Sequence, residues 1–520
     1  FHQIPYFAAE LSKPFASVER GGQDSLYTRL NFATTDGEQV LLKVAISSVS
    51  TEGAELALRE EGATWDFDAV CQNASQRWNE ELATIAIETP DTVQKRLFYT
   101  ALYHSMMAPV LFSDINGDYR GANDSVYNAA EPRFTNFSLW DTYRAKQPLM
   151  TIVQPKRAAQ FVNSMIDICH QQGRLPVWHL WGNETDCMIG DPAIPVVADA
   201  IVKNLKGFDR EKAFEAIKKT AANPERGKGL RHQHGYIPCN LFNEAVAYDM
   251  EYALADGAAA NAAKALGKQE DYEHFTRMSH SYRTFFDAST GFIRGVDDQG
   301  NFRTPFNPYR AQHRADDYCE GNAWQYTWLV PHDVEGLAAC YGGREQMIEK
   351  LDSLFTVSSE ITGDNASSDI SGLIGQYAHG NEPSHHTLYI YSMLGQPWKC
   401  ADKVREVLST LYFDGEAGLS GNEDVGQMSA WYVMSALGFY QAEPASARYW
   451  FGSPIVAEAT LKVKGGEMHI VAENNSAENK YIQRVWLNGK EYRQPWISHS
   501  DLTAGGELRF EMGSEPTLWY

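Results

Sequence analysis

The sequence lacks any long apolar segment and any closely spaced pair of cysteines. No run of 18 apolar residues occurs, so the sequence predicts no membrane span. Seven cysteines are scattered along 520 residues without a C-x-x-C pair, which argues against a zinc-binding module and against a disulfide-rich scaffold. The chain also starts at Phe1 without methionine or a signal peptide. We therefore expect a processed chain or a fragment, in which a missing signal says little about localisation.

Positive charge is also scarce, whereas aromatic residues are plentiful. Lys and Arg number 45 against 67 Asp and Glu, and the formal net charge is −22. A nucleic-acid partner would need a basic face, so the composition argues against one. Aromatic residues make up 12% of the chain, with 13 Trp and 26 Tyr. Exposed Trp and Tyr rings stack on sugars, although most aromatic side chains fill cores.

The hydrophobic pattern divides the chain into three parts and predicts a multidomain α+β protein. A length of 520 residues predicts at least two cores. We expect β-structure in residues 1–70, a helical domain in 71–445 and a β-segment in 446–520. In the first part, alternation over Leu26 to Phe32 and over 40–46 predicts two strands, joined by a hairpin turn at Asp36-Gly37. In the last part, turns are expected at 465–466 and 488–489.

Helical periodicity runs from about Asp91 to Gly438. Val93, Leu97 and Ala101 are expected to share one face of a helix, as are the apolar residues of 158–169. Alanine-rich helices near 244–266 and 427–437 each precede a glycine suited to a helix C-terminus. Ten or more helices separated by polar loops predict an α-toroid. The β-segments of the two chain ends are expected to fold together beside it, with residues 446–520 packing on the N-terminal β-structure or on the toroid.

Polar clusters with a shared composition stand on the loops between these helices. Each combines a carboxylate with Asn, Gln or His and usually a Trp. The clusters are 137–144, 181–185, 320–325, 380–386 and 421–432. Glycoside cleavage needs an acid for the leaving oxygen, a base for water and flat rings for the sugar. Singly, each cluster suits a helix cap, a core Trp or a structural His, because a carboxylate before a helix is more often a cap than a catalyst. Five at successive helix ends converge on one cavity and predict a carbohydrate-active enzyme.

Five strings in this chain are long, ordered and spread over about 300 residues. They are FSLWDTYRAKQPLMTIVQP (137–155), GNETDCMIG (182–190), EGNAWQYTWLVPHD (320–333), GNEPSHH (380–386) and GNEDVGQMSAWYVMSALGFY (421–440). They resemble the signature blocks of the α-mannosidases of glycoside hydrolase family 92. Residues 6–15 also resemble the end of that family's N-terminal β-domain, most of which we expect upstream of Phe1.

The resemblance implies a fold, a reaction and a cofactor. It implies an (α/α)₆ toroid with an accompanying β-sandwich-like domain, and exo-acting release of terminal α-linked mannose from N-glycans or mannans with inversion. It implies bound Ca²⁺ and a secreted, periplasmic or cell-surface enzyme. The general acid falls on Glu320 and the base on Asp424, with Asn422 orienting the water.

Substrate and metal ligands follow from the same blocks. The residues expected to bind substrate are Trp140, Asp141, Arg144, Glu184, Trp324, Gln325 and His385. A hard cation bound to O2 and O3 of mannose would favour the distorted ring of the transition state, and this requires oxygen ligands. The candidate ligands are Asn381, Glu382 and Asn422, with nearby main-chain carbonyls.

Two departures from the family pattern affect the assignment. Many members pair two acids in the block that here contains Asn422 and Asp424, so the base function rests on Asp424 alone. Members that cut α-1,2 links often have His-Glu-Pro where this chain has Asn381-Glu382-Pro383. This leaves α-1,3, α-1,4 and α-1,6 links open.

Two other functions compete with this one. An (α/α)₆ glycosidase or phosphorylase acting on another hexose would not need calcium. A non-catalytic glycan-binding protein could keep the fold, although the carboxylates at Glu320 and Asp424 argue against it.

Overall fold

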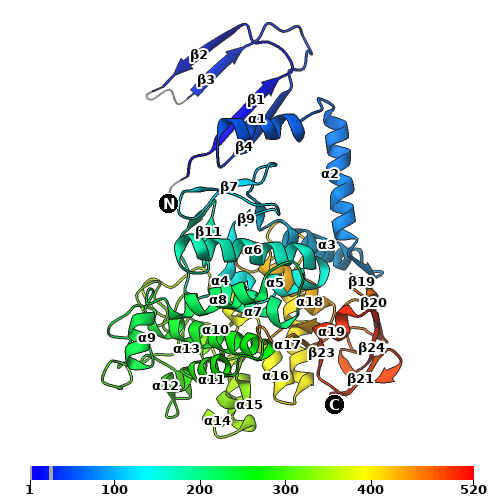
Figure 1. Cartoon of the computed structure of the whole chain (residues 1–520). Helices are drawn as coiled ribbons and strands as arrows, with labels where there is room; N and C mark the ends of the chain where they lie inside the picture. The colour runs from blue at the N-terminus through cyan, green and yellow to red at the C-terminus, as the bar shows by residue number, and fades with distance from the viewer. Residues whose placement is uncertain (1–2, 23–26) are drawn as a thin grey trace. The chain divides into compact units, whose positions relative to one another are not determined.

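The computed structural model describes residues 3–22 and 27–520, and it divides the chain into two compact units of mixed helix and strand (Figure 1). The first unit comprises Phe1–Glu81, Leu111–Phe134 and Trp181–Asn183. The second comprises Leu82–Val110, Thr135–Leu180 and Glu184–Tyr520. In the part of the chain that is described, no helix is long and apolar enough to cross a membrane.

Four strands and then two helices form the start of the chain, and two short strands follow later in the first unit. Their bounds are β1 (Tyr6–Leu11), β2 (Ser17–Gly21), β3 (Tyr27–Asn31), β4 (Leu42–Ser47), α1 (Thr51–Glu60), α2 (Phe67–Leu82), β7 (Asp118–Arg120) and β8 (Val126–Asn128). Strand β1 pairs with β4, β2 with β3, and β7 with β8, all antiparallel.

The predicted hairpin across Asp36-Gly37 is wrong in its pairing. A turn is present there, and Gly37 has φ +77°. Strand β4, however, pairs over six residue pairs with β1 instead of with β3. A period of two marks each strand but does not specify its partner, which explains the error. Leu26, at the start of the predicted strand, lies outside the described residues.

Part of the segment expected to be β-structure is helical. Helix α1 begins where the Ser50 side chain accepts a hydrogen bond from the main-chain N–H of Gly53. Its buried residues are small, so it packs closely while Glu55 and Glu60 stay exposed. Helix α2 follows at Phe67–Leu82. The strand prediction for residues 51–70 is therefore wrong, since the alternation that supported it ends at Ile46.

The expectation of a long helical stretch with ten or more helices is confirmed. The helices are α3 (Thr92–Met106), α4 (Leu139–Thr142), α5 (Lys146–Val153), α6 (Pro155–Gln172), α7 (Ala193–Val202), α8 (Arg210–Ala222), α9 (Lys228–His234), α10 (Ala245–Ala265), α11 (Gln269–Met278), α12 (Tyr282–Phe285), α13 (Ala323–Tyr326), α14 (Val334–Cys340), α15 (Arg344–Leu354), η2 (Glu382–Ser384), η3 (Thr387–Tyr389), α16 (Ile390–Met393), α17 (Pro397–Thr410), α18 (Gln427–Ala436) and α19 (His499–Thr503).

The core of the second unit is built around helices that are buried on almost every side. All ten residues of α18 are buried, as are 16 of the 21 residues of α10. A helix that is apolar all round belongs in an interior. Both predicted ends are confirmed, because α10 ends before Gly267 (φ +71°) and α18 before Gly438 (φ +94°).

The predicted helix faces are confirmed in one case and corrected in another. The apolar residues of α6 between Ala158 and Cys169 are buried as expected. In α3, Val93 is 42% exposed, and the buried face passes through Phe98, Ala101 and Leu102. The predicted face of α3 is therefore rotated, since Phe98 rather than Leu97 contributes to the core.

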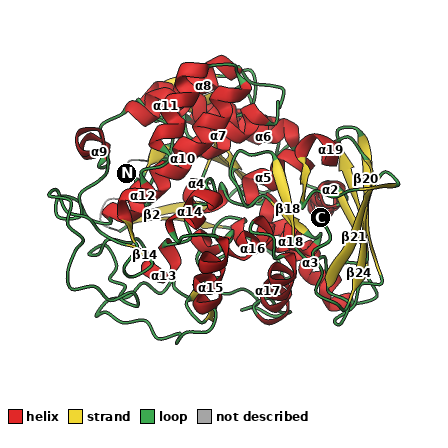
Figure 2. Ribbon diagram, turned by 90° about the horizontal axis from the view of Figure 1, so that it is seen from below, coloured by secondary structure: helices red, strands yellow, loops and turns green. Residues whose placement is uncertain are grey.

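A six-stranded sheet closes the C-terminal part of the second unit (Figure 2). Its order is β22-β21-β24-β20-β19-β5, with β5 (Ile85–Glu88), β19 (Glu458–Val463), β20 (Gly466–Glu473), β21 (Tyr481–Leu487), β22 (Lys490–Glu491) and β24 (Gly506–Gly513). Both predicted turns are confirmed, since β19 pairs with β20 and β21 with β22. The edge partner is β5, and among the described residues no strand of 1–70 joins this sheet, so the expected joining of strands from the two chain ends is wrong there.

Short strands fix the loops between the helices. They are β6 (Val110–Leu111), β9 (Phe134–Thr135), β10 (Phe137–Ser138), β11 (Trp178–Leu180), β12 (Asn183–Glu184), β13 (Phe286–Asp287), β14 (Phe292–Ile293), β15 (Leu373–Ile374), β16 (Tyr377–Ala378), β17 (Phe439–Tyr440), β18 (Arg448–Phe451) and β23 (Trp496–Ser498). Strand β10 leads directly into α4, and β16 leads into the loop before η2. Two of the predicted polar clusters therefore start from hydrogen-bonded strand ends.

Candidate active site

Three carboxylates from distant parts of the chain meet in the second unit. Asp141 lies in α4, Glu382 opens η2, and Asp424 lies on the loop before α18. One carboxylate oxygen from each residue lies within 4.8 Å of the others. Asp141 and Glu382 are buried, and Asp424 is partly buried. The structure thus brings together three of the polar clusters that the sequence singled out.

Burial raises the pKa of all three carboxyl groups, and the charges of neighbouring acids add to the rise. Burial, followed by the charge of Asp424, raises the pKa of Asp141 well above its usual range, while the hydroxyl of Ser138, which donates to it, opposes this. Burial and the charges of Asp141 and Asp424 likewise raise the pKa of Glu382. Burial raises the pKa of Asp424, whereas its hydrogen bond with Glu382 lowers it. Three carboxylates this close repel one another. At least one of them therefore holds a proton, unless a cation lies among them.

Glu320 lies next to this group, and its pKa suits a general acid. Burial, and then the charge of Asp369, raises the pKa of Glu320 to about 7. The charge of Asp424 adds to this rise, which places Glu320 near the predicted base. The side-chain amide of Asn381 opposes it, donating to the Glu320 carbonyl at 2.9 Å and reaching Oε2 at 3.5 Å. A carboxyl with a pKa near 7 can hold a proton at neutral pH and release it to substrate.

The backbones of Glu320 and Asp424 are both left-handed. Their φ values are +47° and +48°, in a region that non-glycine residues rarely occupy. Each such residue costs on the order of 1–3 kcal/mol and persists only where its surroundings hold it. Strain at the two residues predicted to carry the chemistry is consistent with a functional role for these loops.

The loop before α18 contains two adjacent acids with different contacts, Glu423 and the predicted base Asp424. Glu423 accepts hydrogen bonds from the main-chain N–H groups of Gly426 and Ser429, so it stabilises the start of α18. The exposed Asn422 donates its amide to Asp369 at 3.0 Å. Asn422 therefore contacts the edge of the site through Asp369, and its predicted roles toward water and metal stay predictions.

Asp369 is a site residue that the sequence analysis missed. It accepts from Asn422 and from the Ser367 hydroxyl, the latter at 2.6 Å, and its charge acts on both Glu320 and Asp424. Its neighbours in the sequence are Ser and Ile, without the Trp, Asn or Gln that marked the other clusters. Composition therefore gave no signal for it.

Trp140 and Arg144 are organised by Glu251 of α10, a second residue that was missed. Glu251 accepts the Trp140 indole N–H at 3.0 Å, the Tyr143 hydroxyl at 3.0 Å and an Arg144 guanidinium N–H at 2.6 Å. Arg144 and Glu251 are both almost fully buried. The alanine-rich helix α10 also contains Asp249 and Asp256, so composition did not single out Glu251. The contacts of Arg144 serve to hold Trp140 and α4 in place, and its substrate role stays a prediction.

Four other predicted substrate ligands have structural contacts. Glu184 accepts four main-chain N–H groups between Val177 and Asp186. Gln325 completes a capping box with Asn322 at the start of α13. The Trp324 ring packs against Phe292. The site described above does not include these three side chains.

His385 is the fourth of these residues. It is fully buried, with Nδ1 2.9 Å from the Gln427 amide and Nε2 3.1 Å from the His379 carbonyl. Both ring nitrogens are therefore committed to the protein.

The carboxylate group fits a divalent cation. Glu382 Oε1 is buried and, among the described residues, has no hydrogen-bond partner. Calcium prefers carboxylate and carbonyl oxygens, which this group supplies. Of the predicted ligands, Glu382 belongs to the group, while the amide of Asn381 instead bonds Glu320. Asp141 and Asp424 are the other acidic members.

Buried carboxyl groups with raised pKa values, one near neutrality beside a second acid, are an arrangement that acid–base hydrolases use. The catalytic-domain model of glycosyl hydrolase family 92 matches residues 53–514. The chain belongs to this family, and the resemblance noted in the sequence is confirmed.

Solved structures and a curated relative agree with this membership. A family GH92 α-mannosidase from Bacteroides thetaiotaomicron, solved with mannoimidazole, is 38% identical over 99% of this chain and 71% of its own, with a TM-score of 0.92. An inverting GH92 mannosidase from the same bacterium is 32% identical over 99% of this chain and 73% of its own, with a TM-score of 0.88. A secreted glycosidase of Arthroderma benhamiae is 26% identical over 95% of this chain. The chain spans 63% of that relative's length.

Proposed function

We propose that this protein is an exo-acting α-mannosidase that hydrolyses terminal α-linked mannose of N-glycans or mannans with inversion and with the aid of Ca²⁺. The observation that carries the proposal is Glu320, whose pKa is raised to about 7 beside a second acid, Asp424. Family membership and the likeness to two mannosidases support the choice of sugar. The likeness to a secreted glycosidase supports a secreted, periplasmic or cell-surface location.

The reaction follows from the two acids in a single displacement. Glu320, protonated, donates its proton to the departing glycosidic oxygen. Asp424, ionised, takes a proton from water as the water attacks the anomeric carbon from the opposite face. Inversion requires room for that water, so we expect the two carboxyl groups about 6.5–9.5 Å apart in the substrate complex. Asn381 holds Glu320 in place through its carbonyl.

We propose that Glu382 and Asp141 bind the Ca²⁺ ion. The unpartnered Oε1 of Glu382 and the mutual repulsion of the buried carboxylates support this choice. When bound, the cation would supply a hard Lewis acid for two neighbouring hydroxyl oxygens of mannose. We further propose that helices α3 to α18 form the (α/α)₆ toroid of the family, with the carboxylates on the short elements and loops that connect its long helices.

The experiment that tests the proposal is hydrolysis of an aryl α-mannoside with and without EDTA. We expect activity that EDTA abolishes and that added Ca²⁺ restores, with an aryl α-glucoside as the matched substrate control. Glu382→Gln should raise the Ca²⁺ concentration needed for half-maximal activity at least about tenfold, the scale expected when a carboxylate of a metal site is altered. Full activity in EDTA, or equal rates on the glucoside, would refute the assignment.

A further inference from the structure

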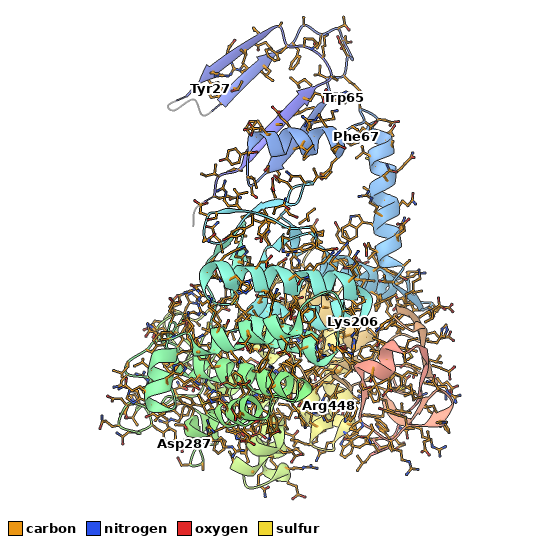
Figure 3. The ribbon with its side chains drawn as sticks, viewed as in Figure 1. Tyr27, Trp65, Phe67, Lys206, Asp287 and Arg448 are labelled. Carbon is orange, nitrogen blue, oxygen red and sulfur yellow. The ribbon has the colours of Figure 1, made fainter. Side chains whose placement is uncertain are left out.

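A second pocket lies in the same unit as the carboxylates but uses none of them. It has a volume of about 810 Å³ and lies between the α5–α6 junction, the loop after α7 and the C-terminal β23–α19 segment. Figure 3 shows Lys206 on the side of the helices that faces the C-terminal strands. The pocket lining contains four lysines, namely Lys156, Lys203, Lys206 and Lys464, and no Asp or Glu. This composition is unusual in a chain with 67 acidic and 45 basic residues.

Three of the four lysines are not neutralised. Lys203 is buried and paired with Asp199 at 2.6 Å, so its charge is balanced locally. Lys156, Lys206 and Lys464 are exposed, and among the described residues none of them forms an ion pair. Lys206 donates only to the neutral side-chain oxygen of Asn204, at 3.2 Å. Three lysines of the lining are therefore without an ion-pair partner in the described part of the chain, while the carboxylate of Asp501 accepts the hydroxyl of the lining residue Ser498.

The charges of two lysines in the lining, Lys203 and Lys464, act on a histidine of the pocket wall. His499 is buried, and its Nδ1 lies 2.9 Å from the Tyr449 hydroxyl. Burial, and then the charges of Lys203 and Lys464, lowers the pKa of His499 to about 2. The imidazole is thus neutral and adds no charge of its own. His499 therefore contributes a neutral polar side chain to the lining.

The remaining lining suits an organic anion of sugar size. Ile152 and Leu205 provide apolar surface. The hydroxyl groups of Ser498, Ser500 and Thr503 also line the pocket, but Ser498 donates to Asp501, Ser500 lies 2.9 Å from the Ser498 hydroxyl, and Thr503 donates to the His499 carbonyl. Lysine ammonium groups bind phosphate and sulfate as point charges. We propose that this pocket is a binding site for a phosphate or sulfate monoester carried by a saccharide, separate from the carboxylate site.

Calorimetric titration of the full chain tests the proposal without reference to hydrolysis. The probes are glucose 6-phosphate, inorganic phosphate and inorganic sulfate, with glucose as the neutral control, at an ionic strength of about 0.05 M, where screening is weak. We expect saturable binding of glucose 6-phosphate and none of glucose. Tighter binding of the sugar ester than of the free ions would identify a saccharide ester, and equal binding would identify the free oxyanion. Both results support an anion site.

Charge-removing variants then locate the binding. Lys206→Met and Lys464→Met should each weaken binding about threefold, and the double variant about tenfold, as expected from the loss of one exposed charge contact each. Lys490→Met removes an exposed lysine that does not line the pocket and should leave binding unchanged. All variants should keep the wild-type hydrolysis rate and melting temperature. Absence of saturable anion binding, or equal affinity in the double variant, would overturn the proposal.

Discussion

The side-chain amide of Asn381 donates to the main-chain oxygen of Glu320 at 2.9 Å, across 61 residues of sequence. This bond joins the loop before η2 to the loop before α13 and holds Glu320 in its left-handed conformation. The next residue, Glu382 at the start of η2, forms a hydrogen bond with the carboxyl group of Asp424. Asn381 and Glu382 therefore link the proposed acid, Glu320, to the proposed base, Asp424.

Replacing Glu320 by Gln should affect substrates according to their leaving groups. A mannosyl disaccharide needs its departing oxygen protonated, whereas a dinitrophenolate leaves unaided. General acid assistance is worth about 10²–10⁴-fold, so Glu320→Gln should lose that factor in kcat/KM on the disaccharide and much less on the activated mannoside. Steady-state kinetics on both substrates measure it. Equal losses would show that another residue is the acid.

Asp424→Asn should impair both substrates equally, because water must attack in each case. We expect kcat to fall by about 10²–10⁴-fold with either leaving group. Glu423→Gln is the matched control, since Glu423 is the neighbouring acid but caps α18. This control should lower the melting temperature and keep most of the activity. If Asp424→Asn remains active and Glu423→Gln does not, the base is Glu423.

Site residues could be predicted from the sequence where their neighbours have a distinctive composition. Glu320, Glu382 and Asp424 stand in blocks with a distinctive composition, so the sequence analysis singled them out. Asp369 stands in a Ser-rich loop, and only the fold brings its charge to Glu320. The structural contacts of Glu184 were also hidden, because the sequence does not show that its carboxylate accepts four main-chain N–H groups.

The fold shows the same division between local and long-range information. The ends of α10 and α18 were predicted because glycine at a helix end is a local signal. The pairing of β5 with β19 joins residues about 370 positions apart. Strand partners at that separation are set by the folded core, and the alternation within each strand does not encode them.

Lys146 provides a pH-dependent test of stability. Its side chain is fully buried, and its amine has no hydrogen-bond partner among the described residues. Burial lowers its pKa to about 7 from the usual 10.5, although the charge of Glu423 opposes this. Between these values the unfolded chain binds more protons than the folded protein, so this residue makes stability rise with pH.

Lys146→Met should therefore stabilise the protein, and more so in acid. A shift of this size corresponds to about 5 kcal/mol at pH 6, and about half of it remains at pH 9. Thermal unfolding of the variant and the wild type at both pH values gives the comparison. Lys490→Met, at an exposed position, should change neither midpoint. A gain in melting temperature that does not shrink at pH 9 would contradict a depressed lysine pKa.

Glu251→Gln tests the support of Trp140. The substitution keeps the shape but removes the charge that balances the buried Arg144. Removing one partner of a buried ion pair costs about 3–5 kcal/mol, so the melting temperature should fall by several degrees. Asp271→Asn, a substitution at a partly exposed acid, is the matched control. An unchanged melting temperature would mean that Arg144 does not depend on Glu251.

The most direct test of the proposed function is the anomeric form of the released sugar. Proton NMR of a fresh digest of an aryl α-mannoside resolves the two anomers before they equilibrate. A single displacement by Glu320 and Asp424 predicts β-mannose as the first product, with the α-anomer appearing only through mutarotation. Initial release of α-mannose would require a covalent intermediate and would contradict this account of the two acids.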